Sequence, residues 1–212
     1  MQNIKFREVL SESWEKFNKQ PGLCIGTFAL YFAISLAAGL LETFIQKLIG
    51  FNPHIVSLLV GAFINFGTTL VFIDIVNDRP TSILRFFDAF NVYPKAFGQY
   101  LLNTICILLG CVLLIVPGII FALGFSTGLY LVLEKKIGII QSFKTSWAIT
   151  KDYKWKLLGM FLLLILLNLA GAICLLIGLI VTVPLSAIVT IEVFRRLISN
   201  HEEKTGEKLC QI

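Results

Sequence analysis

Residues 157–191 read LLGMFLLLILLNLAGAICLLIGLIVTVPLSAIVTI, a run of 35 residues without a charged side chain. An α-helix rises ~1.5 Å per residue, so a single helix of this length would extend about 52 Å. The hydrocarbon core of a bilayer is about 30 Å thick and is crossed by about 20 residues. We therefore predict that the run folds back on itself as two antiparallel transmembrane helices.

The same argument applies to the other uncharged runs. Residues 96–133 are too long for one crossing and predict a second hairpin, whereas residues 22–41 and 55–73 each fit a single crossing. Of the 212 residues, 57% are hydrophobic and 15% are charged, and the mean hydropathy is +0.84. The sequence thus predicts an all-α integral membrane protein with six transmembrane helices in one domain, residues 1–197, followed by a short cytoplasmic tail, residues 198–212.

The positive charges lie almost entirely on one side of the predicted helices. Of the 18 Lys and Arg residues, only Lys47 lies on the other side. Because cytoplasmic loops carry the excess of Lys and Arg, we predict a multi-pass protein of the plasma (inner) membrane with both termini in the cytoplasm. This placement relates the net charge of +5 to membrane topology, and we expect no nucleic-acid partner. Residues 22–41 are not expected to be a cleaved signal peptide, because a charged amphipathic stretch precedes them.

Each predicted hairpin follows a short amphipathic segment. Apolar residues recur at helical spacing before the first hairpin and again before the third: Phe6, Leu10, Trp14 and Phe17, then Ile139, Ile140, Phe143 and Trp147. The dipeptides Ser13-Trp14 and Ser146-Trp147 are 133 residues apart. These features predict three parallel repeats of an interfacial helix plus a transmembrane hairpin, over residues 1–76, 77–134 and 135–197. We expect the apolar faces of the interfacial helices to lie in the lipid headgroup layer.

Several motifs of the C-terminal half occur together in a known group of membrane proteins. They are Val116-Pro117-Gly118-Ile119-Ile120, Ser146-Trp147, Lys154-Trp155-Lys156, Gly171, Gly178, Pro184 and Phe194-Arg195-Arg196-Leu197. On these motifs the chain resembles the membrane domain fused to some glycerophosphodiester phosphodiesterases and its stand-alone bacterial six-helix relatives of unknown function. The resemblance implies a prokaryotic plasma-membrane protein in an envelope or lipid context. It implies no catalytic residue, because the phosphodiesterase chemistry belongs to a separate soluble domain.

One catalytic motif is matched letter for letter. Residues 124–128, GFSTG, match the G-x-S-x-G nucleophile elbow, which requires a strand-to-helix turn, an activating His and an acid. Here the motif falls within the fourth predicted transmembrane helix, and the two His residues, His54 and His201, are predicted outside the bilayer core. We interpret Gly124 and Gly128 as a small-residue packing face. We predict no catalytic residue, no cofactor and no metal site.

Three amides are predicted within the transmembrane helices: Asn65, Asn103 and Asn168. A buried amide needs hydrogen-bond partners, so pairing between helices is the favoured interpretation. The alternative is a substrate site at the middle of the membrane, because polar groups on three helices could build one.

Three acids each close the second helix of a predicted unit: Asp74, Glu134 and Glu192. Ion pairing near the cytoplasmic interface is the favoured interpretation, since Arg195 and Arg196 follow Glu192 at helical spacing. A proton or cation relay is the alternative, because ionisable groups inside membranes are commonly functional.

Six lysines lie in one cytoplasmic loop, which we call the basic segment (residues 135–156): Lys135, Lys136, Lys144, Lys151, Lys154 and Lys156. Such a cluster attracts anionic lipid at roughly 1 kcal/mol per charge near the surface. The sequence therefore predicts a non-catalytic, lipid-interacting scaffold or envelope-homeostasis module, with anionic membrane lipids as partners. A protein partner or a homo-oligomer is compatible with this prediction. The alternative function is a small transporter or channel that uses the intramembrane Asn residues and the interfacial acids.

Overall fold

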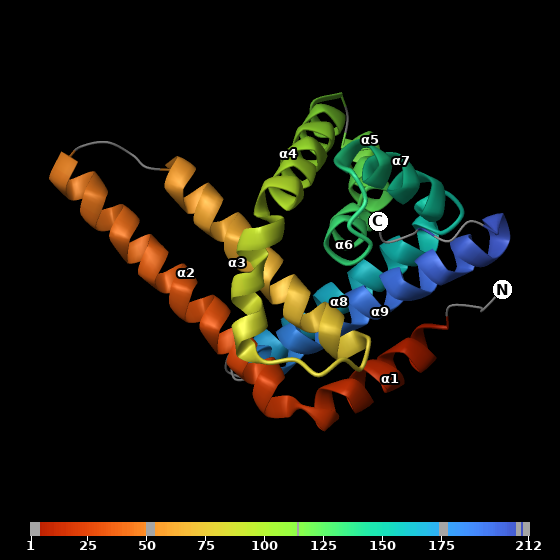
Figure 1. Ribbon diagram of the computed structural model, residues 1–212, viewed down its shortest axis with the longest axis horizontal. Helices are drawn as coiled ribbons and strands as arrows, with labels where there is room; N and C mark the ends of the chain where they lie inside the picture. The colour runs from red at the N-terminus through yellow and green to blue at the C-terminus, as the bar shows by residue number, and fades with distance from the viewer. Residues whose placement is uncertain (1–4, 50–53, 114, 174–177, 207–208, 210–212) are drawn as a thin grey trace.

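The computed structural model describes residues 5–49, 54–113, 115–173, 178–206 and 209. These residues contain helices and connecting turns but no β-strand, as predicted (Figure 1). The elements are α1 (Phe6–Lys19), α2 (Pro21–Ile49), α3 (His54–Val76), the 3-10 helix η1 (Ile83–Asp88), α4 (Ala89–Leu113), α5 (Ile115–Gly124), α6 (Gly128–Glu134), α7 (Ile139–Thr150), α8 (Lys154–Ile173) and α9 (Leu179–Thr205).

Within the described residues, five helical stretches are long and apolar enough to cross a membrane: Pro21–Leu48, Leu58–Val76, Ile83–Val112, Pro117–Glu134 and Lys154–Ile173. The sixth predicted crossing is not among them. In α9, 13 uncharged residues precede Glu192, and Arg195 and Arg196 follow within the same helix. The helix also continues to Thr205, beyond the boundary at residue 197 that the sequence predicts for the membrane domain. The chain is therefore a membrane protein with five candidate spans.

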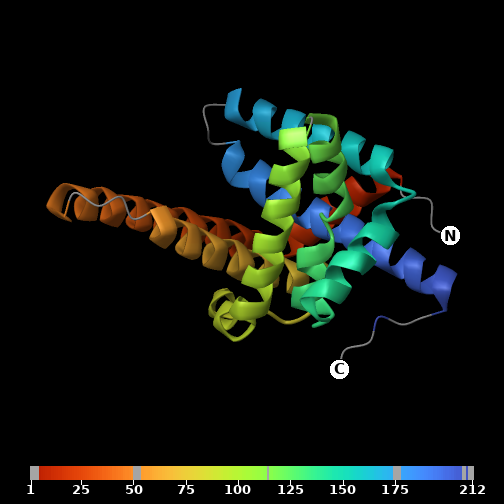
Figure 2. The ribbon, with the colours of Figure 1, turned by 90° about the horizontal axis from the view of Figure 1, so that it is seen from above.

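The α2–α3 hairpin projects from the rest of the molecule as an arm (Figures 1 and 2). Helix α2 of this arm carries many exposed apolar side chains, such as Phe32, Leu40 and Phe44, each more than 60% exposed. In water such a surface would be unfavourable, but in a bilayer lipid tails cover it. The arm is therefore suited to lie within lipid.

The core of the molecule lies where the C-terminal half of α3 meets α6 and α9. Phe66 and Val71 of α3, Leu131 of α6 and Ile188 of α9 have no exposed surface. The first span extends beyond the uncharged run of residues 22–41, because α2 continues to Ile49. This core holds the polar groups described below in fixed positions.

The hairpin predicted for residues 96–133 is formed by α4, which ends at Leu113, and the helices that follow from Ile115 onward. Pro117 lies in the first turn of α5, where a missing N–H is tolerated. Gly118 instead serves packing. A Cβ atom there would lie 3.0 Å from the backbone N of Cys111, so α4 and α5 approach as closely as glycine allows.

The fourth predicted transmembrane helix is not continuous. α5 ends at Gly124, α6 begins at Gly128, and residues 125–127 form a turn between them. The packing interpretation of the two glycines is nevertheless supported, because a Cβ at Gly124 would overlap the Trp147 ring and one at Gly128 would overlap the Gln99 amide. The GFSTG motif of residues 124–128 thus lies at a break between two helices, not within one continuous helix. Broken helices at membrane depth are tolerated where protein surrounds the freed backbone groups.

Candidate functional site

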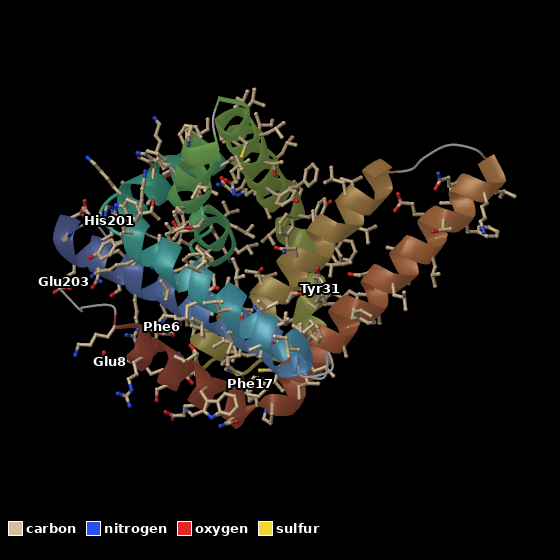
Figure 3. All side chains as sticks on the ribbon, turned by 180° about the vertical axis from the view of Figure 1, so that it is seen from behind. Phe6, Glu8, Phe17, Tyr31, His201 and Glu203 are labelled. Atoms are coloured by element: carbon tan, nitrogen blue, oxygen red, sulfur yellow. The ribbon has the colours of Figure 1, made fainter. Side chains whose placement is uncertain are left out.

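A pocket of about 430 Å³ lies between the broken span and helices α2, α3, α8 and α9. Its described lining contains no Asp, Glu, Lys or Arg. The polar part consists of neutral amides and hydroxyls, chiefly Asn65, Thr68, Ser126, Asn168, Ser186 and Thr190. Tyr31 of α2 also lines it, and Figure 3 marks Tyr31 where the α2–α3 arm approaches α8 and α9. We call this the polar pocket.

The structure brings together two of the three predicted amides. Asn65 and Asn168 both line the polar pocket, whereas Asn103 of α4 is not among its lining residues. The amide Nδ2 of Asn168 donates to Ser186 Oγ on α9 at 2.9 Å, which is the predicted pairing between helices. The amide Oδ1 of Asn168 is buried and accepts no hydrogen bond from the described residues. Asn168 is therefore only partly satisfied.

The hydroxyls of the polar pocket donate along their own helices. Thr68 donates to the carbonyl of Ile64, Ser186 to that of Thr182, and Thr190 to that of Ser186, at 2.7 to 2.8 Å. Each hydroxyl has one proton and two acceptor lone pairs, so its oxygen keeps acceptor capacity after donating. These three hydroxyls can therefore only accept further hydrogen bonds, while the Asn65 amide and the Tyr31 hydroxyl of the same wall also carry donors.

The break in the fourth span is held by a row of hydroxyls on α7. Ser142 Oγ donates to the Gly128 carbonyl at 2.7 Å, while Ser146 and Thr150 donate to the Gly124 carbonyl at 3.0 and 2.9 Å. These residues are spaced by four and share one face of the helix. The Gly124 carbonyl needs these donors, because at the break the Gly128 N–H bonds to the Phe125 carbonyl instead. Ser126, within the break, and Tyr130 of α6 line the polar pocket.

The apolar face of α7 also packs on protein. The Phe143 ring stacks on Phe125 with centroids 3.6 Å apart, and the Trp147 ring lies 5.2 Å from that of Phe125. In α1, Val9 and Phe17 are likewise buried. The expectation that both apolar faces lie against lipid headgroups is therefore wrong for Phe17, Phe143 and Trp147, because other helices of the same chain pack on them. Trp14 and Trp155 remain exposed, at 47% and 85%.

Glu192 is fully buried and surrounded by cations. It accepts hydrogen bonds from Lys16 Nζ at 2.9 Å, Arg195 Nη2 at 2.6 Å and Arg196 Nε at 3.1 Å. The pairing with Arg195 and Arg196 is the one predicted. Lys16 Nζ also donates to the Val76 carbonyl, so this Glu192 cluster joins α1, α3 and α9.

Asp74 and Glu134 share a second group of ion pairs, the Arg79 cluster. Arg79 binds Glu134 through both Nη atoms, at 2.6 and 3.1 Å, and lies 3.5 Å from Asp74. Arg85 Nε donates to Asp74 at 2.8 Å. The hydrogen bonds with Glu134 raise the pKa of Arg79, which therefore stays charged. All three predicted acids are paired in this structure, as the favoured interpretation expects.

The six lysines of the basic segment differ in their surroundings. Lys135 pairs with Glu202 at 3.0 Å, and Lys154 lies 3.5 Å above the Trp147 ring. Lys156 lies near the Tyr153 ring. Lys136, Lys144 and Lys151 are exposed on the surface.

A second pocket, of about 380 Å³, adjoins the basic segment. Phe6 of α1, Leu157 and Met160 of α8 and Leu197 of α9 form its apolar wall, and Lys156 and Tyr153 contribute polar groups. Figure 3 shows Phe6 on α1 beside these helices. We call this the apolar pocket.

Sequence reasoning missed three features of the site. The sequence identified Lys16 only as one of the cytoplasmic positive charges, yet Lys16 pairs with Glu192, 176 positions away. The break at Gly124–Gly128 and the buried Gln99 beside it were not recognised either. The spacing of Ser142, Ser146 and Thr150 by four is a signal that could have indicated a polar face on α7.

Comparison with known families places these features in a wider group. A family model described as uncharacterised protein family UPF0259 matches residues 34–201. The chain belongs to this family. The match is consistent with the stand-alone relatives of unknown function in the resemblance above, and it does not show a phosphodiesterase fusion. No curated protein and no solved structure matches the chain.

Proposed function

We propose that this member of family UPF0259 is a non-catalytic, lipid-binding module of the plasma membrane. In this proposal the chain crosses the bilayer six times in three repeated units, with α9 as the sixth crossing and both termini in the cytoplasm. The order of elements supports the repeat, because α1, η1 and α7 each precede a helical hairpin. The charge distribution along the sequence supports the topology.

The observation that carries the lipid proposal is the apolar pocket beside the basic segment. Its volume of about 380 Å³ and its wall of Phe, Leu and Met suit part of an acyl chain, and Lys156 supplies a cation for an anionic headgroup. Trp155, the most exposed large apolar side chain of α8, lies next to it in sequence and is suited to the membrane interface. Exposed Lys136, Lys144 and Lys151 extend the positive surface.

Lipid enrichment around the purified protein tests this proposal. The protein is reconstituted in phosphatidylcholine with a minor fraction of phosphatidylglycerol, and the lipids that copurify are quantified. Charge reversal of Lys136, Lys144 and Lys151 to Glu should lower phosphatidylglycerol enrichment, and salt should weaken the enrichment of the native protein. These three lysines are preferred to Lys154, whose contact with Trp147 is part of the fold.

A matched variant separates local binding from net charge. Reversal of Arg7, Lys19 and Lys95, which are also exposed, changes the total charge by the same amount outside the basic segment. We expect this variant to keep most of the enrichment. Equal loss in both variants, or no loss in either, would refute the proposal.

Topology is tested by labelling single cysteines from outside the cell. Cysteine at Lys47 should react, whereas cysteine at Lys136 or Glu203 should not. Reaction at Glu203 would place the end of α9 outside and leave five crossings.

A second candidate function is transport through the polar pocket, favoured because Asn65 and Asn168 meet there. Flux of ions or protons into liposomes would support it, particularly if Asp74→Asn, Glu134→Gln or Glu192→Gln abolished that flux while the protein stayed folded. The lipid proposal predicts no ion flux from the native protein.

A further inference from the structure

We propose that the polar pocket binds an uncharged group that bears one free hydroxyl, namely the glycerol moiety of a diacylglycerol that enters from the bilayer. This site is separate from the apolar pocket and its anionic lipid. The proposal rests on three properties of the pocket wall: its neutrality, the unmet acceptor of Asn168 and its contact with the lipid-facing surface.

The uncharged lining of the polar pocket disfavours a charged ligand. The described lining offers no countercharge, and a charged group brought to membrane depth without one would be strongly disfavoured. The volume of about 430 Å³ lies within the range of known small-ligand pockets.

The unmet acceptor of Asn168 favours a ligand that donates a hydrogen bond. Thr68, Ser186 and Thr190 have used their protons within their own helices. Asn168 has used its Nδ2 group, while its Oδ1 accepts no hydrogen bond from the described part of the chain. A hydroxyl donor would satisfy this oxygen, because a buried acceptor without a donor is costly.

The remaining lining points to an amphiphile rather than a free polyol. Phe72, Phe161 and Ile165 give the pocket an apolar side, and Ile165 is 62% exposed on the same face of α8 as Leu162 and Leu169. Asn65 is also exposed. The polar wall is thus continuous with a surface that acyl chains would cover in a bilayer.

Two pairs of variants isolate the pocket chemistry. Asn168→Leu removes the unmet acceptor, and Asn103→Leu makes the same change outside the pocket. Thr190→Val removes a pocket hydroxyl and keeps the side-chain shape, and Thr104→Val removes an equivalent hydroxyl of α4, which also donates to a carbonyl four residues before it. Thr190→Val keeps the test valid even if Asn168→Leu does not fold.

The experiment measures binding of radiolabelled dioleoylglycerol to the full chain in nanodiscs of dioleoylphosphatidylcholine. Because these bilayers contain no anionic lipid, the result does not depend on the basic segment. We expect saturable binding that weakens about fivefold in Asn168→Leu and in Thr190→Val and changes less than about twofold in the two controls. Trioleoylglycerol, which lacks the hydroxyl, should not compete.

Absence of saturable binding, equal competition by trioleoylglycerol, or equal losses in the pocket and control variants would each overturn the proposal. Competition by free glycerol at millimolar concentration would overturn the lipid source and assign the site to a water-soluble polyol.

Discussion

The Glu192 cluster and the Arg79 cluster use the same chemistry in different surroundings. In the Glu192 cluster the acid and Lys16 are both buried, with side chains 0% and 9% exposed. In the Arg79 cluster Asp74 is buried and the Glu134 side chain is 10% exposed, but Arg79 and Arg85 are 45% and 40% exposed. Water therefore solvates the cations of one cluster and not the central cation of the other. The difference teaches that the cost of breaking an ion pair depends on where the remaining charge is left.

The largest expected effect comes from Glu192→Gln. The substitution leaves Lys16 buried beside the neutral amide, with the Val76 carbonyl as its other described partner. Removing one member of a buried ion pair costs about 3–5 kcal/mol. We expect a loss of that size in the free energy of unfolding, measured by reversible denaturation of the purified protein in mixed micelles. A loss below about 1 kcal/mol would break the comparison, because Glu192 would then behave like a surface residue.

Removing both charges tests whether the stranded cation is the cause. The double variant Lys16→Met/Glu192→Leu removes both charges of the buried pair, so neither is left without its partner. Arg195 and Arg196 lose the acceptor that they share. Replacement of a buried pair by apolar residues is often neutral or stabilising. We expect the double variant to recover at least half of the stability lost in Glu192→Gln, in the same unfolding measurement. A double variant as unstable as the single one would mean that the pair itself, rather than the unpaired charge, stabilises the fold.

The sequence alone leads to a smaller expectation for Glu192. It identifies Arg195 and Arg196 as partners because they lie three and four positions along the same helix, and exposed pairs of that kind contribute little. Nothing local indicates that Lys16 reaches the same carboxylate from the first helix. Contacts between residues 176 positions apart depend on how the helices assemble, and hydrophobic runs do not encode that assembly.

The membrane class and the hairpins could be predicted, because they depend on local properties of the sequence rather than on long-range contacts. The length of an uncharged run sets how often it can cross about 30 Å of hydrocarbon, and this is a local property of residues 96–133 or 157–191. The broken helix was not predictable in this way. Gly124 and Gly128 read equally well as a packing face, and the break is stabilised by Ser142, Ser146 and Thr150 of a later helix. Asn65 and Asn168 could be proposed as a site, but only the packing of α3 and α8 against α9 decides that Asn103 is left out of it.

A smaller effect is expected for Glu134→Gln in the Arg79 cluster. Arg79 is 45% exposed, so its guanidinium can turn toward water and keep its contact with Asp74 when the carboxylate is removed. Solvent-exposed ion pairs contribute about 0.2–1 kcal/mol, and the amide oxygen introduced by the substitution can still accept a hydrogen bond from Asn77. The expected loss is therefore at most about 1 kcal/mol in the unfolding assay. A loss equal to that of Glu192→Gln would show that exposure of the cation does not distinguish the clusters.

The smallest expected effect is the response of these two losses to salt. Raising the ionic strength from about 0.05 M to about 0.5 M shortens the Debye length from roughly 14 Å to roughly 4 Å, which screens charges that water reaches. The loss caused by Glu134→Gln should therefore shrink toward zero, because Arg79 is solvated. The loss caused by Glu192→Gln should change by less than about a quarter, since counterions cannot approach a carboxylate with no exposed surface. Unfolding each variant and the native protein at both salt concentrations measures this, and an equal salt response in the two variants would mean that ions penetrate the junction of α1, α3 and α9.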